Sequence, residues 1–234
     1  MAPRVARGRV VQAAVVALVA IGLYANSLGG GFVYDDPNAI TGNAAVVEGD
    51  VRAILVTPSW WGDGRGTLWR PLTTLTFALE HALFGPAPFW FHLVNVGLHA
   101  LVSVLVLLVF VRVGTPSVVA FGAALLFASH PVHTEVVANV VGRAELLAAA
   151  GFFVAWGCWL AADAASGAAA TGWLGAAAGT FFLAMLAKEH AIALPAVLVA
   201  SDLVRRGHEP PGALVARRAP HYAALLAVAL LYVA

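Results

Sequence analysis

Two adjacent carboxylates, Asp35 and Asp36, are the residues of this chain best suited to chemistry. They follow the first long apolar segment, and a carboxylate beside a membrane can accept the proton of an attacking hydroxyl when its neighbours set its pKa. Pro37 holds the residue before it extended, so we expect both carboxylates on a turn, outside any helix. The alternative is a turn or helix cap, a position that Asp and Asn also favour. The residues alone leave these two interpretations open.

A second polar segment covers residues 130–135 and ends in Glu135, our third candidate catalytic residue. Helical spacing would bring Glu135 near Asn139, with Arg143 one or two turns further on. Two histidines and a glutamate also raise the question of a metal. The spacing is not H-E-x-x-H and no further ligand is obvious, so we predict no metal and no cofactor, and assign His133 to substrate contacts. A capping cluster is the alternative.

Cations near these segments could bind a phosphate. Lys188 and His190 form a third polar segment, and Arg70 lies among aromatic residues. The ammonium group of lysine is a compact charge and the guanidinium group of arginine can bind a phosphate through two N–H groups, so we predict that an anion such as a lipid phosphate is bound by Arg70, Arg143, Lys188, His133 and His190. The alternatives are snorkelling of Lys188, a cation over Trp69, and ion pairs of Arg143 and Lys188 with the neighbouring Glu145 and Glu189.

The composition places all of these residues in a membrane protein. Hydrophobic residues make up 61% of the 234 residues and charged residues 11%, against about 25% charged in an ordinary soluble domain. A net charge of +1 gives no basic field for nucleic acid, so nucleic acid is not an expected partner. The single cysteine, Cys158, excludes an intrachain disulfide.

Apolar runs predict an all-α, polytopic transmembrane bundle of about seven spans. The first follows Arg4, Arg7 and Arg9 and is too long for a secretory signal, which indicates an uncleaved signal anchor. Residues 29–88 form a long loop with interfacial helices expected around 47–57 and 71–84, and with tryptophans suited to the headgroup level at 60, 61, 69 and 90. The predicted spans are 10–28, 89–111, 117–129, 146–162, 172–187, 191–204 and 220–234.

The placement of the cations predicts the orientation of the chain in the membrane, because short loops on the cytoplasmic (inside) face carry an excess of Lys and Arg. With the N-terminal arginines inside, the cations at 112, 205, 206, 217 and 218 also fall inside, and the three polar segments all fall outside. Arg143 and Lys188 then lie outside, against this rule. A cation kept on that side indicates an anion beside it, such as a lipid phosphate. We therefore expect the three polar segments to form one site.

Eight short motifs, taken in order, resemble the transmembrane and tetratricopeptide-repeat-containing O-mannosyltransferases, which are GT-C membrane glycosyltransferases. No tetratricopeptide repeat occurs in this chain, and the last apolar run has no polar tail, so we expect residues 1–234 to be the N-terminal part of a longer GT-C-like membrane domain. The motifs are Tyr24-Ala25-Asn26-Ser27-Leu28, Phe32-Val33-Tyr34-Asp35-Asp36, Trp69-Arg70-Pro71-Leu72-Thr73, Phe91-His92-Leu93-Val94-Asn95, Leu98-His99, His130-Pro131-Val132-His133-Thr134-Glu135, Gly142-Arg143-Ala144-Glu145 and Lys188-Glu189.

The resemblance implies transfer of a sugar, mannose in the family, from a polyprenyl phosphate to a protein Ser or Thr hydroxyl on the outer or lumenal face. The acidic pair would supply the catalytic carboxylate, with the choice between Asp35 and Asp36 left open. One carboxylate would suffice with inversion, because a lipid phosphate leaves as a stabilised anion and needs no proton, unlike the alcohol that a glycosidase releases.

The alternative is a non-catalytic membrane protein, either a transporter fragment or a scaffold subunit. A transporter is expected to hold its polar residues near the bilayer midplane, whereas this chain gathers them at one rim. The high content of alanine and arginine, with Lys188 as the single lysine, is typical of a GC-rich bacterial genome. We therefore predict a bacterial cytoplasmic membrane with the site facing the periplasm, or the endoplasmic reticulum if the protein is eukaryotic.

Overall fold

The computed structural model describes residues 2–57, 68–207 and 209–233, with side chains from residue 7 onward. Every regular element in these ranges is a helix, which confirms the predicted all-α fold. The α-helices are α1 (Ala2–Tyr24), α2 (Asp36–Ala39), α3 (Ala44–Val47), α4 (Val51–Val56), α5 (Pro71–Phe84), α6 (Pro88–Val113), α7 (Ser117–Ser129), α8 (Thr134–Ala138), α9 (Arg143–Asp163), α10 (Gly167–Ala187), α11 (Leu194–Arg205) and α12 (Pro211–Val233). Four short 3-10 helices join them, namely η1 (Ala25–Gly29), η2 (Pro131–His133), η3 (Val140–Gly142) and η4 (Glu189–Ala193).

Proline and glycine set the ends of the helices around the long loop. Pro71 and Pro88 begin α5 and α6, where a missing N–H costs no helical hydrogen bond. Gly114 ends α6 with φ of 107°, a left-handed conformation that glycine adopts at little cost. Pro71 at the start of α5 and Gly85 just past its end, with φ of 72°, explain why the predicted helix 71–84 matches α5 residue for residue.

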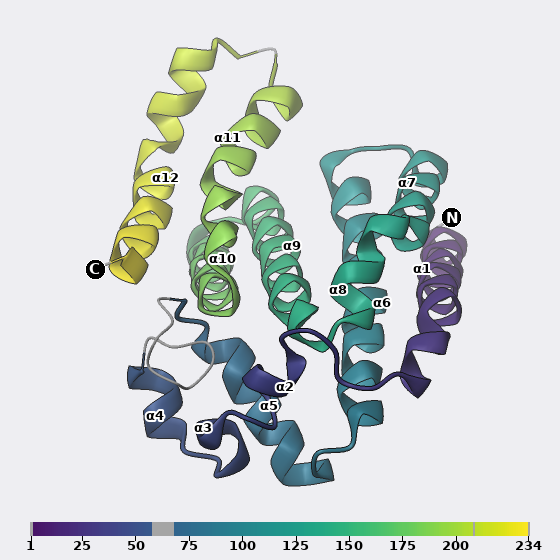
Figure 1. Cartoon of the computed structure of the whole chain (residues 1–234). Helices are drawn as coiled ribbons and strands as arrows, with labels where there is room; N and C mark the ends of the chain where they lie inside the picture. Colours follow the sequence, from purple (N-terminus) through teal and green to yellow (C-terminus); the bar gives the residue numbers. More distant parts are fainter. Residues whose placement is uncertain (1, 58–67, 208, 234) are drawn as a thin grey trace.

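The long helices run side by side, and α2–α5 gather at one end of them (Figure 1). Helix α9 packs between α6 and α10, α1 packs against α6 and α7, and α12 packs against α10 and α11. At the α9–α10 crossing, a Cβ added to Gly151 would lie 2.8 Å from the Cβ of Ala184. Small residues therefore set the close approach of these two helices, as is common inside membranes.

The number of membrane spans differs from the sequence prediction. Within the described ranges five helices are long and apolar enough to cross a membrane, or six if α7 and the segment Pro131–Ala138, bent by 45°, form one broken span. The predicted span 191–204 is wrong by this measure, because it divides into η4 and the 12-residue α11. Val118, Leu126 and Leu230 are each more than two-thirds exposed, as side chains facing lipid would be. The chain is an integral membrane protein.

The loop contains two of the predicted interfacial helices and one that was not predicted. Of the helix expected around 47–57, the structure has α4, while α3 lies before it and shares only Val47 with the predicted range. Each is capped by a side chain: Asn43 accepts from the N–H of Ala45, and Asp50 from that of Ala53. Helix α2 was not predicted, because we expected the acidic pair outside any helix. Of the four tryptophans expected at the headgroup level, Trp90 lies in α6, and Trp60 and Trp61 lie outside the described residues.

The charged residues divide between the two ends of the molecule. The arginines predicted to share a side do lie together, since Asp163 at the end of α9 pairs with Arg205, Arg206 and Arg218. The three polar segments meet near the opposite end, beside α2–α5 (Figure 1). The predicted convergence is therefore present in the fold.

Candidate active site

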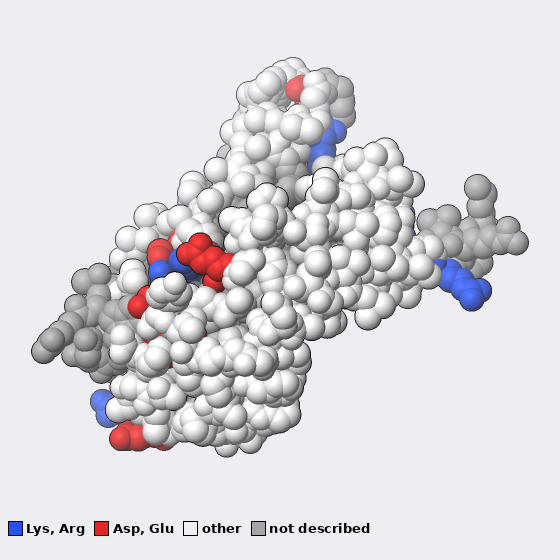
Figure 2. Space-filling model, turned by 45° about the vertical axis from the view of Figure 1, so that its right-hand side comes forward, with Lys and Arg blue, Asp and Glu red and all other residues white. Residues whose placement is uncertain are grey.

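One pocket brings the polar segments together. It has a volume of about 230 Å³, and its lining comes from the long loop, from the α8–η3 region and from the starts of α9 and η4. Figure 2 shows acidic and basic atoms grouped in a hollow on an otherwise largely uncharged face. We call this the carboxylate pocket, lined by Asp35, Leu68, Arg70, Glu135, Val136, Asn139, Val141, Gly142, Glu145 and Lys188.

The structure separates the two members of the acidic pair. Asp35 is exposed and lines the pocket. Asp36 is fully buried at the start of α2, where its Oδ2 accepts the N–H of Val33 at 3.0 Å and its Oδ1 accepts the N–H of Val141 at 2.8 Å. The expectation that both carboxylates are presented on a turn is therefore wrong for Asp36. The bond from Val33 closes the turn within the long loop, and the bond from Val141 joins the loop to the segment before α9.

The turn before the pair holds Asp35 at the pocket. Tyr34 has φ of 50°, in the left-handed region that residues other than glycine seldom occupy. Its side chain is 89% exposed, so no side-chain packing compensates for this backbone cost. The buried bonds of Asp36, two residues further on, hold the turn in place.

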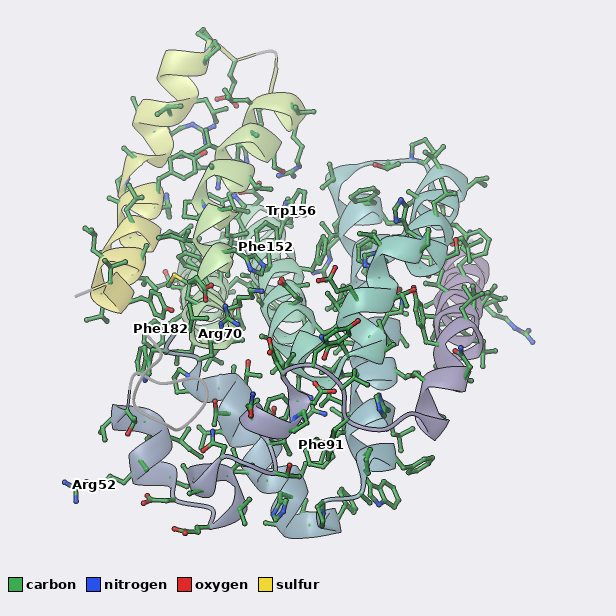
Figure 3. All side chains as sticks on the ribbon, in the orientation of Figure 1. Arg52, Arg70, Phe91, Phe152, Trp156 and Phe182 are labelled. Carbon is green, nitrogen blue, oxygen red and sulfur yellow. The ribbon has the colours of Figure 1, made fainter. Side chains whose placement is uncertain are left out.

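Arg70 reaches the pocket from the start of α5. Its Nε and Nη2 donate to the two carboxylate oxygens of Glu189 at 3.1 and 2.8 Å, a bidentate pair that joins the loop to η4. The bond from Arg70 lowers the pKa of Glu189 below its ordinary value. A lowered carboxyl pKa stabilises the fold above the ordinary pKa, and this contribution is lost as the pH falls through the folded value. In Figure 3 Arg70 lies where α5, α10 and α11 come together.

Lys188 and Glu145 form the second ion pair of the pocket. The Nζ of Lys188 donates to Oε1 of Glu145, and the Nε2 of His190 lies 3.4 Å from Oε2 of the same carboxylate. His190 is half exposed and lies at the rim, outside the lining. Of the ion pairs proposed from adjacency in sequence, neither Arg143–Glu145 nor Lys188–Glu189 is the pair that the structure shows.

Glu135 is exposed in the first turn of α8 and lines the pocket with Asn139, as the spacing predicted. The helix ends there, because Asn139 has an extended backbone, with φ of −91° and ψ of 122°. The helical spacing from Glu135 to Arg143 is therefore interrupted by η3, and Arg143 does not lie on the same face.

Arg143 does not reach the carboxylate pocket. Its side chain has no exposed surface, and its guanidinium pairs with Glu80, donates to Oδ1 of Asn95 at 2.9 Å and donates to the carbonyl of Phe91 at 2.9 Å. The guanidinium carbon lies 4.7 Å from the centre of the Phe77 ring. The predicted contact of Arg143 with a donor phosphate is at odds with this position, because a buried cation already held by a carboxylate cannot face a ligand in the pocket.

His133 also lies apart from the pocket. Its ring is 4.4 Å from that of Phe127 and 5.1 Å from that of His99, in a cluster beside α6 and α7. The assignment of His133 to substrate contacts is therefore not supported by the geometry. His130, Pro131 and Thr134 likewise do not line the pocket.

The polar residues of α6 have packing roles. Asn95 donates to the carbonyls of Asn139 and Val140, and the Nε2 of His99 lies 3.0 Å from the carbonyl of Ala128. The Nε2 of His92 lies 3.4 Å from the carbonyl of Gly31. These bonds satisfy backbone groups where helices break, which fixes the segments that carry the pocket residues.

The sequence did not reveal the role of Glu80, nor the close packing of Gly142, which it gave only as part of a family motif. Glu80 is buried in α5 and balances the charge of Arg143, but a lone glutamate in an amphipathic helix gives no sign of its partner. Gly142 approaches the α8 backbone so closely that an added Cβ would lie 2.5 Å from the Cα and the carbonyl oxygen of Val136.

Replacing Gly142 by Ala is expected to destabilise the protein by about 1–3 kcal/mol, the usual cost of overpacking. The methyl group would meet rigid backbone at Val136 and would push α8 away from η3 at the pocket. Thermal unfolding of the purified protein measures the effect. Gly97→Ala is the matched control, since the added Cβ would meet nothing within 4 Å. Equal melting temperatures for the two variants would contradict the prediction.

Among the described residues no group of three or more His, Cys, Asp or Glu side chains could hold a metal ion. The absence of a metal requirement stays a prediction. In the pocket lining Glu145 is paired with Lys188 and Arg70 is paired with the neighbouring Glu189, while Asp35 and Glu135 are exposed carboxylates, an arrangement that suits acid–base and phosphate chemistry.

Comparison with known proteins gives relatives of one kind. The chain is 36% identical over 191 residues to protein O-mannosyl-transferase TMTC2 of Mus musculus, covering 78% of this chain and 23% of that protein. It is 47% identical over 133 residues to protein O-mannosyl-transferase Tmtc2 of Drosophila melanogaster (54% and 14%), and 43% identical over 144 residues to protein O-mannosyl-transferase TMTC1 of Homo sapiens (57% and 16%). No family model and no solved structure matches.

These relatives confirm the resemblance drawn from the eight motifs. The chain spans less than a quarter of the length of each of the three relatives.

Proposed function

We propose that this chain, which resembles the transmembrane and tetratricopeptide-repeat-containing O-mannosyltransferases, forms the donor and acceptor end of a protein mannosyltransferase. The relatives are named for mannose transfer to protein. The single observation that carries the proposal is the carboxylate pocket, where an exposed aspartate lies with two cations at one end of a membrane bundle.

Asp35 is the general base of this proposal. It is exposed in the pocket, whereas both oxygens of Asp36 already accept backbone N–H groups. A base must reach the hydroxyl proton that it removes, so geometry favours Asp35. Asp36 has a positioning role, because its buried bonds hold the turn that presents Asp35.

The reaction breaks one bond and forms one. The oxygen of a protein Ser or Thr hydroxyl attacks the anomeric carbon of mannose, the bond from that carbon to the polyprenyl phosphate breaks, and the hydroxyl proton passes to Asp35. The phosphate leaves with the bonding electrons as an anion and needs no acid. Attack opposite the leaving group inverts the anomeric centre.

Lys188 and Arg70 stabilise the departing phosphate. Each is held at the pocket by a carboxylate, Glu145 and Glu189 respectively, and this pairing fixes the position of the charge before the donor binds. His190 at the rim adds a third donor beside Glu145. Glu135 supplies a second exposed carboxylate, which accepts hydrogen bonds from sugar or acceptor hydroxyls. Arg143 and His133 take no part in this version of the site.

The pocket faces the outer or lumenal side in this proposal, because the arginines at the opposite end follow the positive-inside rule. The three relatives compared above come from animals, where that side is the lumen of the endoplasmic reticulum. In a bacterium it is the periplasm.

A transfer assay tests the proposal. The intact protein in nanodiscs receives polyprenyl-phosphate mannose and a peptide containing Ser and Thr, and mannosylated peptide is measured by mass spectrometry. Product that depends on the lipid donor is the expected result. Donor binding without product would instead favour the non-catalytic alternative, a transporter or scaffold subunit.

Replacing Lys188 by Gln is expected to lower kcat/KM for the lipid donor by about tenfold or more, since a hydrogen bond to a charged group contributes about 1.5–3 kcal/mol. The neutral amide of Gln, on a side chain one atom shorter, still offers N–H donors but removes the charge that meets the phosphate. Steady-state kinetics with varied donor measure the change. Arg52→Gln is the control, because Arg52 projects away from the molecule in Figure 3. Equal kinetics for Lys188→Gln and the wild type would exclude Lys188 from donor binding.

A further inference from the structure

We propose that an anionic phospholipid binds at the end of the molecule opposite the carboxylate pocket, with its phosphate among arginines and an acyl chain in a groove between α6 and α9. This site does not depend on the proposed enzymatic function. Two neighbouring cavities, one apolar and one basic, both include Arg112 in their lining, and this shared residue carries the inference.

The first cavity is an apolar groove of about 180 Å³. Leu105 and Leu108 of α6 form one wall, Phe153 and Val154 of α9 form the other, and Gly157 leaves room between them. Such a groove on the flank of a membrane helix pair fits a hydrocarbon chain. Arg112 closes one end of it.

The second cavity has a volume of about 560 Å³ and continues from Arg112 to the ends of α9 and α11. Its charged lining is Arg112, Arg205, Arg206 and Asp163, and the half-exposed Trp173 lies at its edge. Tryptophan favours the headgroup level of a bilayer, and clustered arginines beside membrane helices favour anionic headgroups.

At the end of the molecule with these two cavities, two aspartates are shared among three arginines. Asp163 pairs with Arg205, Arg206 and Arg218, and Asp202 lies 3.7 Å from Arg205 and 3.5 Å from Arg218. The described contacts give Arg112 a backbone partner, the carbonyl of Gly157 at 3.1 Å, and no carboxylate within ion-pair distance. The exposed Arg112 therefore keeps positive charge and N–H donors for a phosphate.

The apolar groove favours a phospholipid over a free anion as the ligand of this site. Inorganic phosphate would gain the arginine contacts but would leave the groove unfilled. A phospholipid fills both cavities at once, and Arg112 lies where its phosphate and its acyl chains join. The polyprenyl-phosphate donor has related chemistry, but its site in the proposed function lies at the other end of the bundle.

The test uses the full chain purified in detergent and titrated with phosphatidylglycerol, phosphatidylcholine or inorganic phosphate. Native mass spectrometry counts bound lipid, and thermal unfolding reports the stabilisation. Phosphatidylglycerol is expected to bind and to raise the melting temperature. Phosphatidylcholine and inorganic phosphate are expected to have no comparable effect. Arg112→Gln is expected to weaken phosphatidylglycerol binding about fivefold, from about 1 kcal/mol for one cation near an anionic lipid.

Two further variants complete the test. Gly157→Ala should narrow the groove and weaken lipid binding with no arginine replaced, since the added Cβ would make an ordinary contact, 3.4 Å, with the flexible end of Arg112. Arg52→Gln removes an exposed cation of α4 and should leave binding unchanged. Equal stabilisation by inorganic phosphate, equal binding of the two lipids, or wild-type binding by Arg112→Gln would each overturn the proposal.

Discussion

Replacing Asp35 by Asn is expected to reduce mannose transfer by about 10²–10⁴-fold, the usual contribution of a general base. Asn keeps the size and hydrogen-bonding shape of the side chain but cannot take the hydroxyl proton. Because Asp35 is exposed, the variant should fold and melt as the wild type does. Product formation with saturating donor and peptide, measured beside thermal unfolding, checks both halves of the prediction.

Asp36→Asn is the matched comparison, since it makes the same change one residue further along. The carboxylate of Asp36 uses a separate oxygen for each of two backbone N–H groups, and an amide has one oxygen and a donor in place of the other. This variant should therefore lose stability, and lose activity through the turn that it holds. Transfer at the wild-type rate by Asp35→Asn, with a folded but inactive Asp36→Asn, would reverse the two assignments.

Replacing Arg143 by Met is expected to destabilise the protein by about 3–5 kcal/mol, the cost of leaving one buried charge without its partner. Glu80 would remain almost fully buried without its cation, and Asn95 and the carbonyl of Phe91 would each lose a donor. The free energy of unfolding, or the melting temperature in nanodiscs, measures the loss. The same substitution would act on transfer only through folding, because Arg143 does not line the pocket.

A second variant separates the loss of the Arg143–Glu80 ion pair from the loss of side-chain packing. The double substitution Glu80→Gln with Arg143→Met removes both charges and is expected to recover part of the stability that Arg143→Met loses. If Arg143→Met instead melted as the wild type and lost donor binding alone, the original prediction of a phosphate-binding arginine would be correct and the buried ion pair would be irrelevant to the fold.

The apolar runs and the helix-end signals by themselves determined much of this protein. They identified an integral membrane helical bundle, placed α5 at its observed bounds, and indicated that three polar segments would share one end. These features depend on the periodicity of apolar residues, on the backbone conformations of proline and glycine, and on the cost of burying charge. Each of these is a local property, so it can be read from the residues of one segment. The ordered motifs likewise indicated the family resemblance.

Only the tertiary structure decided which of the charged residues face the pocket. Asp35 and Asp36 are neighbours of identical chemistry. Only Asp36 is buried, where it accepts a hydrogen bond from the N–H of Val141, 105 residues away. Arg143 was expected at the pocket because it broke the orientation rule, and nothing in the sequence indicated that its partner is Glu80, 63 residues earlier. Ion pairs and buried hydrogen bonds form between whichever groups the fold brings within about 3 Å, and sequence spacing carries that information only inside a single helix.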